Sequence, residues 1–358
     1  MGASQALKVV SEVPAVELGA ERHIVHSHRI GREFQVTVSR PLATPFVPGQ
    51  TFPVMFALDG GMGVAGPMAT VLGYAGAMAP ALVVSVGYQP EQQHHRMTDL
   101  AHNQTTGFDG VAFGGGGAAF QAFLLDDLQP FIESRYPADL TRTALFGHSL
   151  GGLFAANVMA DRPGAFGAYV IGSPSIVADP GVVGRVEKAI SKAKGGRVFL
   201  GVGSHEDAFF ISRGQDAGML TGFARLDAAL RRQPRIASKT HIYPGEGHVS
   251  VYSRIIEDAF PFVFPPRRPL TAPHPKPRRG ALRRYAGVYT LPDGRKATIT
   301  LTPGDMLMAR VADLPWVPLT HVGANRFHAP TSDLDVLFDN AGFTITGGGG
   351  ATWRGVRD

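Results

Sequence analysis

The sequence of 358 residues contains no cysteine. This absence excludes disulfide bonds, a thiol nucleophile and metal sites built from thiolates. It does not decide the compartment, because cytoplasmic proteins and exported proteins that need no disulfide both fit it. Residues 1–20 show no basic start followed by an apolar core, so we predict no signal peptide in the sequence as it stands. Localisation is left open: cytoplasmic as written, periplasmic or secreted if a signal peptide has been removed.

The sequence also lacks a long apolar run and a broadly spread positive charge. No segment approaches the roughly 20 apolar residues that a membrane-spanning helix needs. The formal net charge is +5, but many basic residues lie in one short stretch: Arg267, Arg268, Lys276, Arg278, Arg279, Arg283 and Arg284. Charge confined in this way is typical of a solvated linker rather than of a nucleic-acid-binding face. We therefore expect neither nucleic acid nor membrane as a partner.

Recognisable metal-ligand spacing is missing as well. His26 with His28, and His94 with His95, come nearest to a ligand cluster. Neither pair has the third ligand or the helical spacing of a known zinc motif. The four glycines at 114–117 are not followed by the Gly-Lys-Ser/Thr of a phosphate-binding loop. The sequence thus predicts no metal and no cofactor.

Four short apolar runs recur along the first part of the chain, at 53–58, 81–87, 142–147 and 197–203. A short apolar run bounded by turn residues is typical of a parallel strand that is buried on both faces. Helix-compatible segments lie between successive runs, including an apolar stripe over 120–132 that Pro130 should kink or break. This alternation predicts a doubly wound α/β sheet.

The composition changes after Phe264. Residues 265–280 are rich in proline and basic side chains, which predicts an extended spacer. From residue 281 onward, short β-type runs alternate with turn sequences such as Pro292-Asp293-Gly294. We therefore predict an α/β catalytic domain at 1–264, a linker at 265–280 and a small all-β domain at 281–358.

The strongest functional signal is Gly147-His148-Ser149-Leu150-Gly151. It follows an apolar strand and precedes a helix-forming segment, which is the context that gives G-x-S-x-G its meaning as a nucleophile elbow. The turn exposes the Ser149 hydroxyl, and the start of the following helix offers N–H groups to a developing anion. Ser149 is therefore the predicted nucleophile.

A serine nucleophile needs a base, and the base needs a carboxylate that orients it. In folds with this elbow the acid and then the histidine follow the serine along the chain. His248, in a Gly-rich loop after a strand, is the predicted base, ahead of His205 and of His241, which we expect to be packed within a strand. Glu206 is favoured over Asp207 as the acid, and the choice stays open.

The negative oxygen of an acyl-transfer intermediate needs two N–H donors. Leu150, directly after the nucleophile, supplies one in this arrangement. The loop after the 53–58 strand is the natural source of the second, because its glycines let the backbone approach the substrate. We predict that the second donor is the N–H group of Gly61.

The chain from about Ile30 to Phe264 resembles the esterase branch of the α/β-hydrolases, which includes siderophore-ester hydrolases, feruloyl esterases and related carboxylesterases. The resemblance is carried by 56–60, 84–88, 96–99, 147–154, 172–175 and 247–248. It implies an α/β-hydrolase fold. Arg96 and Asp99 match an R-x-x-D pattern of that branch. Arg96, Asp207 and His148 could contact substrate or order a loop, and for Arg96 and Asp99 an internal ion pair is the favoured role. The segment 285–289 is similar to the start of a small β-domain appended to some serine β-lactamase-like hydrolases.

Three functions fit these residues. The leading one is a metal-independent esterase acting on a small-molecule ester, a siderophore-type lactone or another bulky ester. The alternatives are an acyltransferase that uses the same triad and a non-catalytic ligand-binding member of the fold. The sequence does not predict the oligomeric state.

Overall fold

The computed structural model describes residues 19–42, 47–107, 110–212, 214, 218–269, 271–272, 274–275, 277–278 and 280–358. An open eight-stranded sheet is followed along the chain by a closed eight-stranded barrel. The predicted fold class, an α/β-hydrolase sheet followed by a small all-β domain, is confirmed. The signal-peptide prediction falls almost wholly on residues 1–18, which lie outside the described residues, as do positions 270, 273, 276 and 279 of the predicted linker.

The open sheet has the strand order β1-β2-β4-β3-β7-β8-β9-β10. The bounds are β1 Ala20–Ser27, β2 Arg32–Ser39, β3 Phe52–Ala57, β4 Leu82–Gly87, β7 Ala138–His148, β8 Ala168–Gly172, β9 Gly196–Gly203 and β10 Ile236–Tyr243. β2 pairs antiparallel with both β1 and β4, and the pairs from β4 to β10 are parallel. Every residue of β3 and β4 is buried, as apolar runs in a doubly covered sheet should be.

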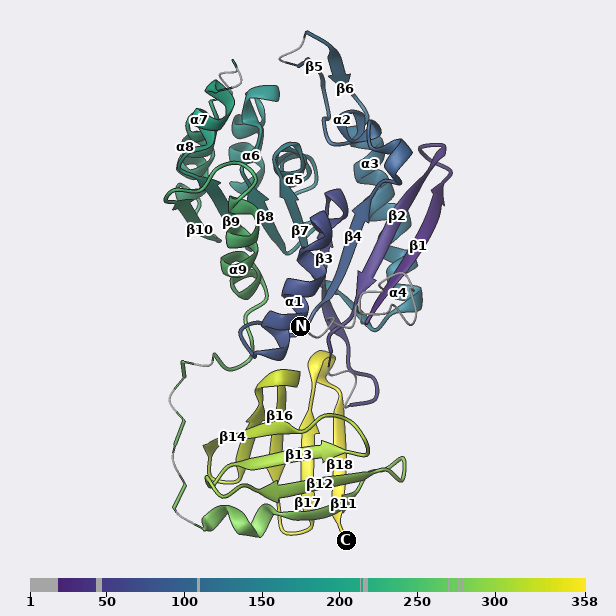
Figure 1. Ribbon diagram of the computed structural model, residues 1–358, viewed down its shortest axis with the longest axis vertical. Helices are drawn as coiled ribbons and strands as arrows, with labels where there is room; N and C mark the ends of the chain where they lie inside the picture. The colour runs from purple at the N-terminus through teal and green to yellow at the C-terminus, as the bar shows by residue number, and fades with distance from the viewer. Residues whose placement is uncertain are drawn as a thin grey trace, which may run out of the picture.

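Helices cover both faces of this sheet (Figure 1). The α-helices are α1 Ala65–Tyr74, α2 His95–Asp99, α3 Gly117–Ala122, α4 Gln129–Arg135, α5 Leu150–Asp161, α6 Val182–Ile190, α7 Glu206–Ile211, α8 Met219–Arg231 and α9 Val251–Val263; short helices are η1 Asp59–Gly63, η2 Pro90–Gln92 and η4 Ile176–Ala178. α3 to α6 and α8 pack on one face, and α1 and α9 pack on the other. A two-stranded hairpin, β5 Gln104–Thr106 and β6 Ala112–Gly114, stands apart from the sheet.

The helix before the nucleophile strand changes its winding instead of breaking. Between α3 and α4 the chain forms a π-helix, η3 Phe123–Leu128, and Pro130 occupies the first turn of α4. A proline cannot donate an N–H and crowds the preceding turn, and a π-turn is one way to accommodate it inside a continuous helical segment. The predicted break at Pro130 is thus a local widening of the helix.

The barrel is closed because its first and last strands pair with each other. Its strands are β11 Gly287–Thr290, β12 Lys296–Leu301, β13 Leu307–Val311, β14 Val317–Gly323, β15 Arg326–Ala329, β16 Leu334–Phe338, β17 Gly342–Thr346 and β18 Thr352–Arg357, with short helices η5 Ala281–Tyr285, η6 Pro330–Ser332 and η7 Gly348–Gly350. Aromatic side chains fill much of the interior, among them Tyr289, Phe327 and Phe338. Such a barrel holds a packed core with no open sheet edge.

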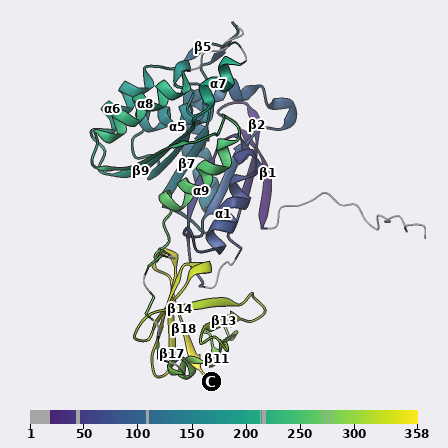
Figure 2. The same ribbon diagram turned by 60° about the vertical axis from the view of Figure 1, so that its left-hand side comes forward.

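The barrel is joined to the sheet domain by more than the linker. Val47, from the loop before β3, belongs to the apolar core of the barrel. A side chain at Gly348 would approach the Thr51 carbonyl oxygen to 2.3 Å, so backbone packs on backbone there. The barrel lies at the end of the sheet domain opposite to the β5–β6 hairpin (Figures 1 and 2). Within the described ranges, no helix is both long and apolar enough to cross a membrane.

Candidate active site

Ser149 lies in a sharp turn between β7 and α5, with φ 60° and ψ −121°. A side chain at Gly147 would lie 2.0 Å from the Gly151 carbonyl oxygen, so this turn can form only if position 147 is glycine. Few non-glycine residues tolerate such backbone angles, and the residues that do are concentrated at functional sites. The turn holds the Ser149 side chain at the carboxyl end of the central strand, where a ligand can reach it.

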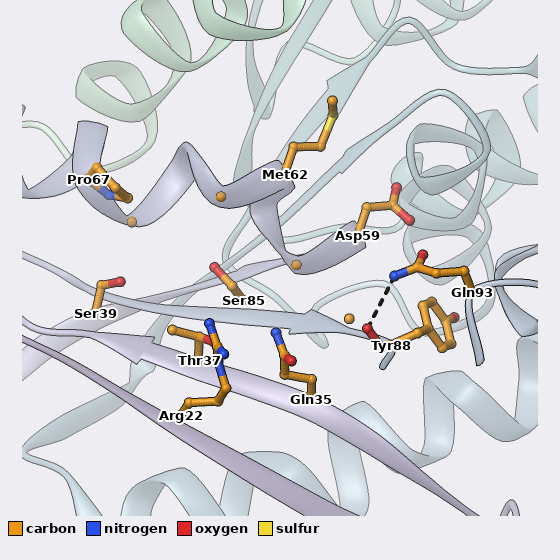
Figure 3. Close-up of a pocket in the computed structure, with 14 residues that line it drawn as sticks. Arg22, Gln35, Thr37, Ser39, Asp59, Met62, Pro67, Ser85, Tyr88 and Gln93 are labelled. Carbon is orange, nitrogen blue, oxygen red and sulfur yellow. Dashed lines mark hydrogen bonds between the residues drawn. The ribbon is translucent and has the colours of Figure 1, made fainter. Parts of the chain in front are cut away.

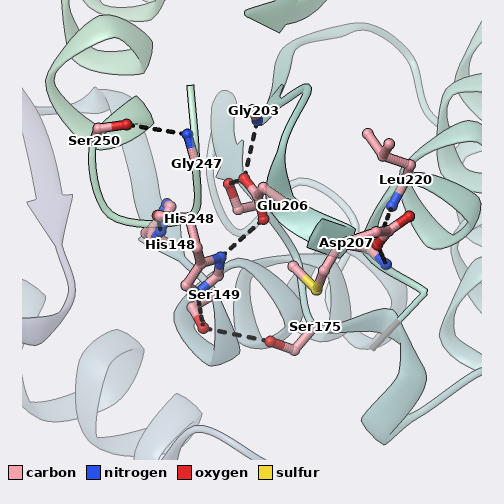
Figure 4. Close-up of polar contacts among 12 residues, drawn as sticks. His148, Ser149, Ser175, Gly203, Glu206, Asp207, Leu220, Gly247, His248 and Ser250 are labelled. Carbon is pink, nitrogen blue, oxygen red and sulfur yellow. Dashed lines mark hydrogen bonds and ion pairs between the residues drawn. The ribbon is translucent and has the colours of Figure 1, made fainter. Parts of the chain in front are cut away.

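His248 and Glu206 form a continuous hydrogen-bonded line with Ser149 (Figure 4). The distance from Ser149 Oγ to His248 Nε2 is 2.9 Å, and that from His248 Nδ1 to Glu206 Oε2 is 2.8 Å. A carboxylate can only accept, so His248 donates from Nδ1, and its Nε2 lone pair faces the serine hydroxyl. The structure therefore brings together the predicted nucleophile, base and acid.

Glu206 is fully buried, yet it is held as an anion. Its Oε1 accepts hydrogen bonds from the Gly203 N–H, at 2.9 Å, and from the Ser173 hydroxyl. Burial by itself raises the pKa of Glu206, but these bonds and the one from His248 outweigh burial and bring the pKa below its ordinary value. The carboxylate is thus charged and fixed in position before any substrate binds.

The other candidates for base and acid point elsewhere. Asp207 Oδ1 accepts the N–H groups of Met219 and Leu220, at 2.7 and 3.4 Å, and so caps the start of α8 (Figure 4). His205 is exposed at the start of α7. His241 lies on the edge strand β10 and is exposed, not packed as expected.

His148 holds the loop of His248 through a hydrogen bond. Its Nε2–H donates to the backbone carbonyl oxygen of His248 at 2.8 Å, and its Nδ1 is buried without a partner. Burial and the neighbouring His248 lower the pKa of His148 to about 4. His148 is therefore neutral near pH 7 and holds the loop that carries His248 through this hydrogen bond.

The two predicted oxyanion donors differ in their surroundings. Leu150 is the first residue of α5, where N–H groups have no partner within the helix. The Gly61 N–H donates to the Leu58 carbonyl oxygen at 2.9 Å and is engaged within its own turn. That turn, η1, is left-handed throughout, with positive φ even at Asp59 and Met62. The role of Gly61 stays a prediction.

Arg96 and Asp99 do not pair with each other. Arg96 forms a two-pronged ion pair with Asp59, Nε to Oδ1 at 2.6 Å and Nη2 to Oδ2 at 2.9 Å. Asp99 is bound by Arg32 and by the Tyr88 hydroxyl. Both residues of the R-x-x-D pattern thus fasten α2 to the sheet domain, and Arg96 fastens it to the left-handed turn η1.

A cavity of about 660 Å³ opens onto Ser149 and His248. Its walls come from α2, the β5–β6 hairpin, the start of α5, the η4 segment and Phe210 of α7. A second, polar cavity of about 250 Å³ lies beneath the left-handed turn, where Thr37, Ser39 and Ser85 line it (Figure 3). It contains none of the Ser149, His248 and Glu206 side chains, so the larger cavity is the candidate active site.

Three contributors to the site were not singled out from the sequence: Ser173, which binds Glu206; Ser175, whose hydroxyl is 3.4 Å from that of Ser149; and Asp59, the partner of Arg96. Ser173 and Ser175 both follow the end of β8, the neighbour of the nucleophile strand. Parallel strands end at one edge, so polar residues just after β8 were a usable signal. In the described part of the chain, no three His, Cys, Asp or Glu side chains are grouped to hold a metal ion.

Comparison with known proteins places the chain in a family. Residues 27–253, more than half of the chain, match the family described as "Putative esterase". The ferri-bacillibactin esterase BesA of Bacillus subtilis is 29% identical over 70% of this chain and 91% of its own length. The apo-salmochelin esterase of Escherichia coli is 27% identical over 40% of this chain and 48% of its own length. The crystal structure of the BES protein from Bacillus cereus superposes with a TM-score of 0.63 and 27% identity, covering 71% of this chain and 99% of that one.

Proposed function

Because this chain belongs to the esterase family, we propose that it is a carboxylic-ester hydrolase that works through an acyl-enzyme on Ser149. The observation that carries the proposal is the unbroken hydrogen-bonded line from Ser149 through His248 to the buried Glu206. The substrate is a small-molecule ester, either a siderophore-type lactone or another bulky ester, since relatives are named for siderophore esters.

In the first half of the reaction His248 Nε2 takes the proton of Ser149 while Oγ bonds to the ester carbonyl carbon. Glu206, charged and fixed, stabilises the imidazolium that forms and keeps the ring in its orientation. The imidazolium then protonates the leaving alkoxide as the ester C–O bond breaks. The acyl group remains on Ser149, and the alcohol departs.

In the second half a water molecule repeats the sequence. His248 takes a proton from the water, the hydroxide oxygen bonds to the acyl carbon, and the proton returns to Ser149 Oγ as its bond to the acyl group breaks. The negative oxygen that appears in both halves lies between the Leu150 N–H and the turn that carries Gly61. Each such donor is typically worth roughly 3–4 kcal/mol of transition-state stabilisation.

Labelling with a fluorophosphonate tests this proposal directly, because the reagent modifies an activated serine. We expect one label per chain, located by peptide mass spectrometry on Ser149 and not on Ser173 or Ser175. His248→Gln should slow the labelling strongly. A label on another serine, or none, would refute Ser149 as nucleophile.

The same preparation distinguishes hydrolysis from acyl transfer. A p-nitrophenyl ester is turned over with and without an added alcohol or amine acceptor, and the products are quantified. A hydrolase releases mainly the free acid in both cases. Transfer product in excess of the acid would identify an acyltransferase.

A further inference from the structure

Exposed apolar side chains gather around the mouth of the large cavity. Met97, Val111 and Val177 line it and are between 40% and 61% exposed. Ile211, next to the lining residue Phe210, and Val249, next to His248, are each exposed to a similar degree. Of these five residues, only Met97, Val111 and Val177 line the cavity itself; they come from three separate segments of the chain and together are called the apolar rim below. Apolar side chains exposed in a group mark a binding surface more often than single ones do.

The cavity has little charge to offer a ligand. Among the described residues that line it, Arg96 alone carries a permanent charge. Both Asp59 oxygens neutralise that guanidinium at hydrogen-bond distance. A site built for a polyanion uses unpaired arginine and lysine to attract it and to replace its hydration. A polyanion entering this cavity would lose hydration without gaining a free cationic partner among the described residues that line it.

From the rim and the charge balance we infer that this site selects uncharged esters with a bulky apolar group. The reacting carbonyl lies at Ser149, and the apolar group of the substrate covers the apolar rim. Esters that carry several negative charges, such as the ferric complex of a catecholate trilactone, are discriminated against. The same trilactone without iron, whose catechols are largely protonated at neutral pH, is accepted. This inference rests on the proposed esterase function and specifies its substrate class.

The first experiment compares p-nitrophenyl acetate with p-nitrophenyl octanoate. Each buried methylene contributes about 0.8 kcal/mol, so partial burial of the longer chain on the rim should raise kcat/KM at least about tenfold. Met97→Ser and Val111→Ser should lower the octanoate-to-acetate ratio of kcat/KM about threefold or more each, chiefly through KM for the octanoate. Both residues are on the surface, and melting temperatures check that the variants remain folded.

Val71→Ser is the matched control. Val71 is 64% exposed on α1 and does not line the cavity, so its substitution should leave the ratio unchanged. A flat chain-length profile, or rim variants that behave like Val71→Ser, would overturn the apolar part of the inference. If even the acetate is not hydrolysed and the fluorophosphonate does not label Ser149, the proposed function fails instead.

The second experiment tests charge with a catecholate trilactone, such as enterobactin, in its metal-free and ferric forms. The kcat/KM of the metal-free form should be at least about tenfold higher than that of the ferric form. A tenfold ratio corresponds to a difference of about 1.4 kcal/mol in transition-state binding. Equal or faster hydrolysis of the ferric complex would refute discrimination against polyanions.

Discussion

The sheet domain and the barrel each bury a histidine, and the groups that surround the two rings differ in charge. His148 of the sheet domain contacts a carbonyl oxygen and leaves its Nδ1 without a partner. His328 of the barrel has Asp335 Oδ1 3.0 Å from its Nδ1 and Asp333 Oδ1 3.6 Å from its Nε2. The hydrogen bond from His328 lowers the pKa of Asp335, whereas burial raises the pKa of Asp333.

The difference reflects what each region must do. In the sheet domain, a buried polar atom without a partner lies beside Ser149, whose own backbone is strained, and such costs are commonly found at functional sites. In the barrel, the polar cluster lies at the junction with the linker, where Arg267 also binds Asp333. The carboxylates of this cluster compensate charge locally, although His328 Nε2, like His148 Nδ1, makes no hydrogen bond. We therefore expect changes in the sheet domain to alter catalysis and changes in the barrel to alter stability.

The largest expected effect is that of Ser149→Ala. Removing the nucleophile of a triad typically costs on the order of a million-fold in kcat. The melting temperature should change little, so activity and stability separate. A variant that keeps measurable turnover of p-nitrophenyl esters at more than about a thousandth of the wild-type rate would contradict this role.

Glu206→Gln should follow, with a loss in kcat of roughly a thousandfold to ten-thousandfold, because the neutral amide no longer stabilises the imidazolium or fixes its tautomer. Asp207→Asn is the control one residue away. It keeps an oxygen that can accept the N–H groups at the start of α8 and should remain within a few-fold of wild type. If the two variants exchanged behaviour, Asp207 would be the acid.

His148 predicts a pH dependence of stability. The unfolded chain takes up a proton near the ordinary pKa of 6.5, whereas the folded protein does so only near 4. The buried neutral ring makes its full contribution to stability above pH 6.5, and this contribution is lost as the pH falls towards 4. At pH 5 the loss is about 2 kcal/mol. Urea unfolding at pH 7 and pH 5 should show this loss for wild type and a smaller one for His148→Gln. Parallel changes in the two proteins would contradict the assignment.

Arg267→Ala should have a smaller effect than these changes and should leave kcat unchanged. The side chain is partly exposed, and it loses a hydrogen bond to the Gly347 carbonyl oxygen and ion pairs with Asp333 and Asp335. The expected cost is about 1 kcal/mol of unfolding free energy. Arg354→Ala, which removes a more exposed pair with Asp339, should cost less. A change in esterase activity with Arg267→Ala would break the division of roles between the two regions.

The sequence was most informative where one short motif fixes local geometry. Gly147 and Gly151 around Ser149, and the apolar runs of β3 and β4, follow from steric and burial rules that act over a few residues. Pairings between distant segments were not readable. The partners of Arg96 and Asp99 are Asp59 and Arg32, which the sheet brings close although no local pattern connects them. Likewise, nothing local to 236–243 reveals that β10 is an edge strand, so the exposure of His241 could not be foreseen.

The sequence also could not decide which of the adjacent carboxylates, Glu206 or Asp207, is the acid. Both carboxylates follow the end of β9 within a few residues and lie in the first turn of α7. Their roles diverge because α7 begins at Glu206, which directs one side chain inward and the other towards the start of α8. Where a helix starts is the least predictable part of its sequence, because neighbouring residues fit equally well.

The backbone angles of Ser149 affect how the stability of this protein can be increased and at what loss of activity. Glycine adopts a positive φ without steric cost, so the substitution Ser149→Gly would relieve strain of the order of 1–3 kcal/mol that serine bears in every folded molecule. Part of that gain is offset, because glycine also makes the unfolded chain more flexible. A laboratory selection for heat resistance alone would therefore tolerate or favour loss of the nucleophile. Thermostable variants must therefore be screened for turnover in every round, because the fold gives up stability at the position of the proposed nucleophile.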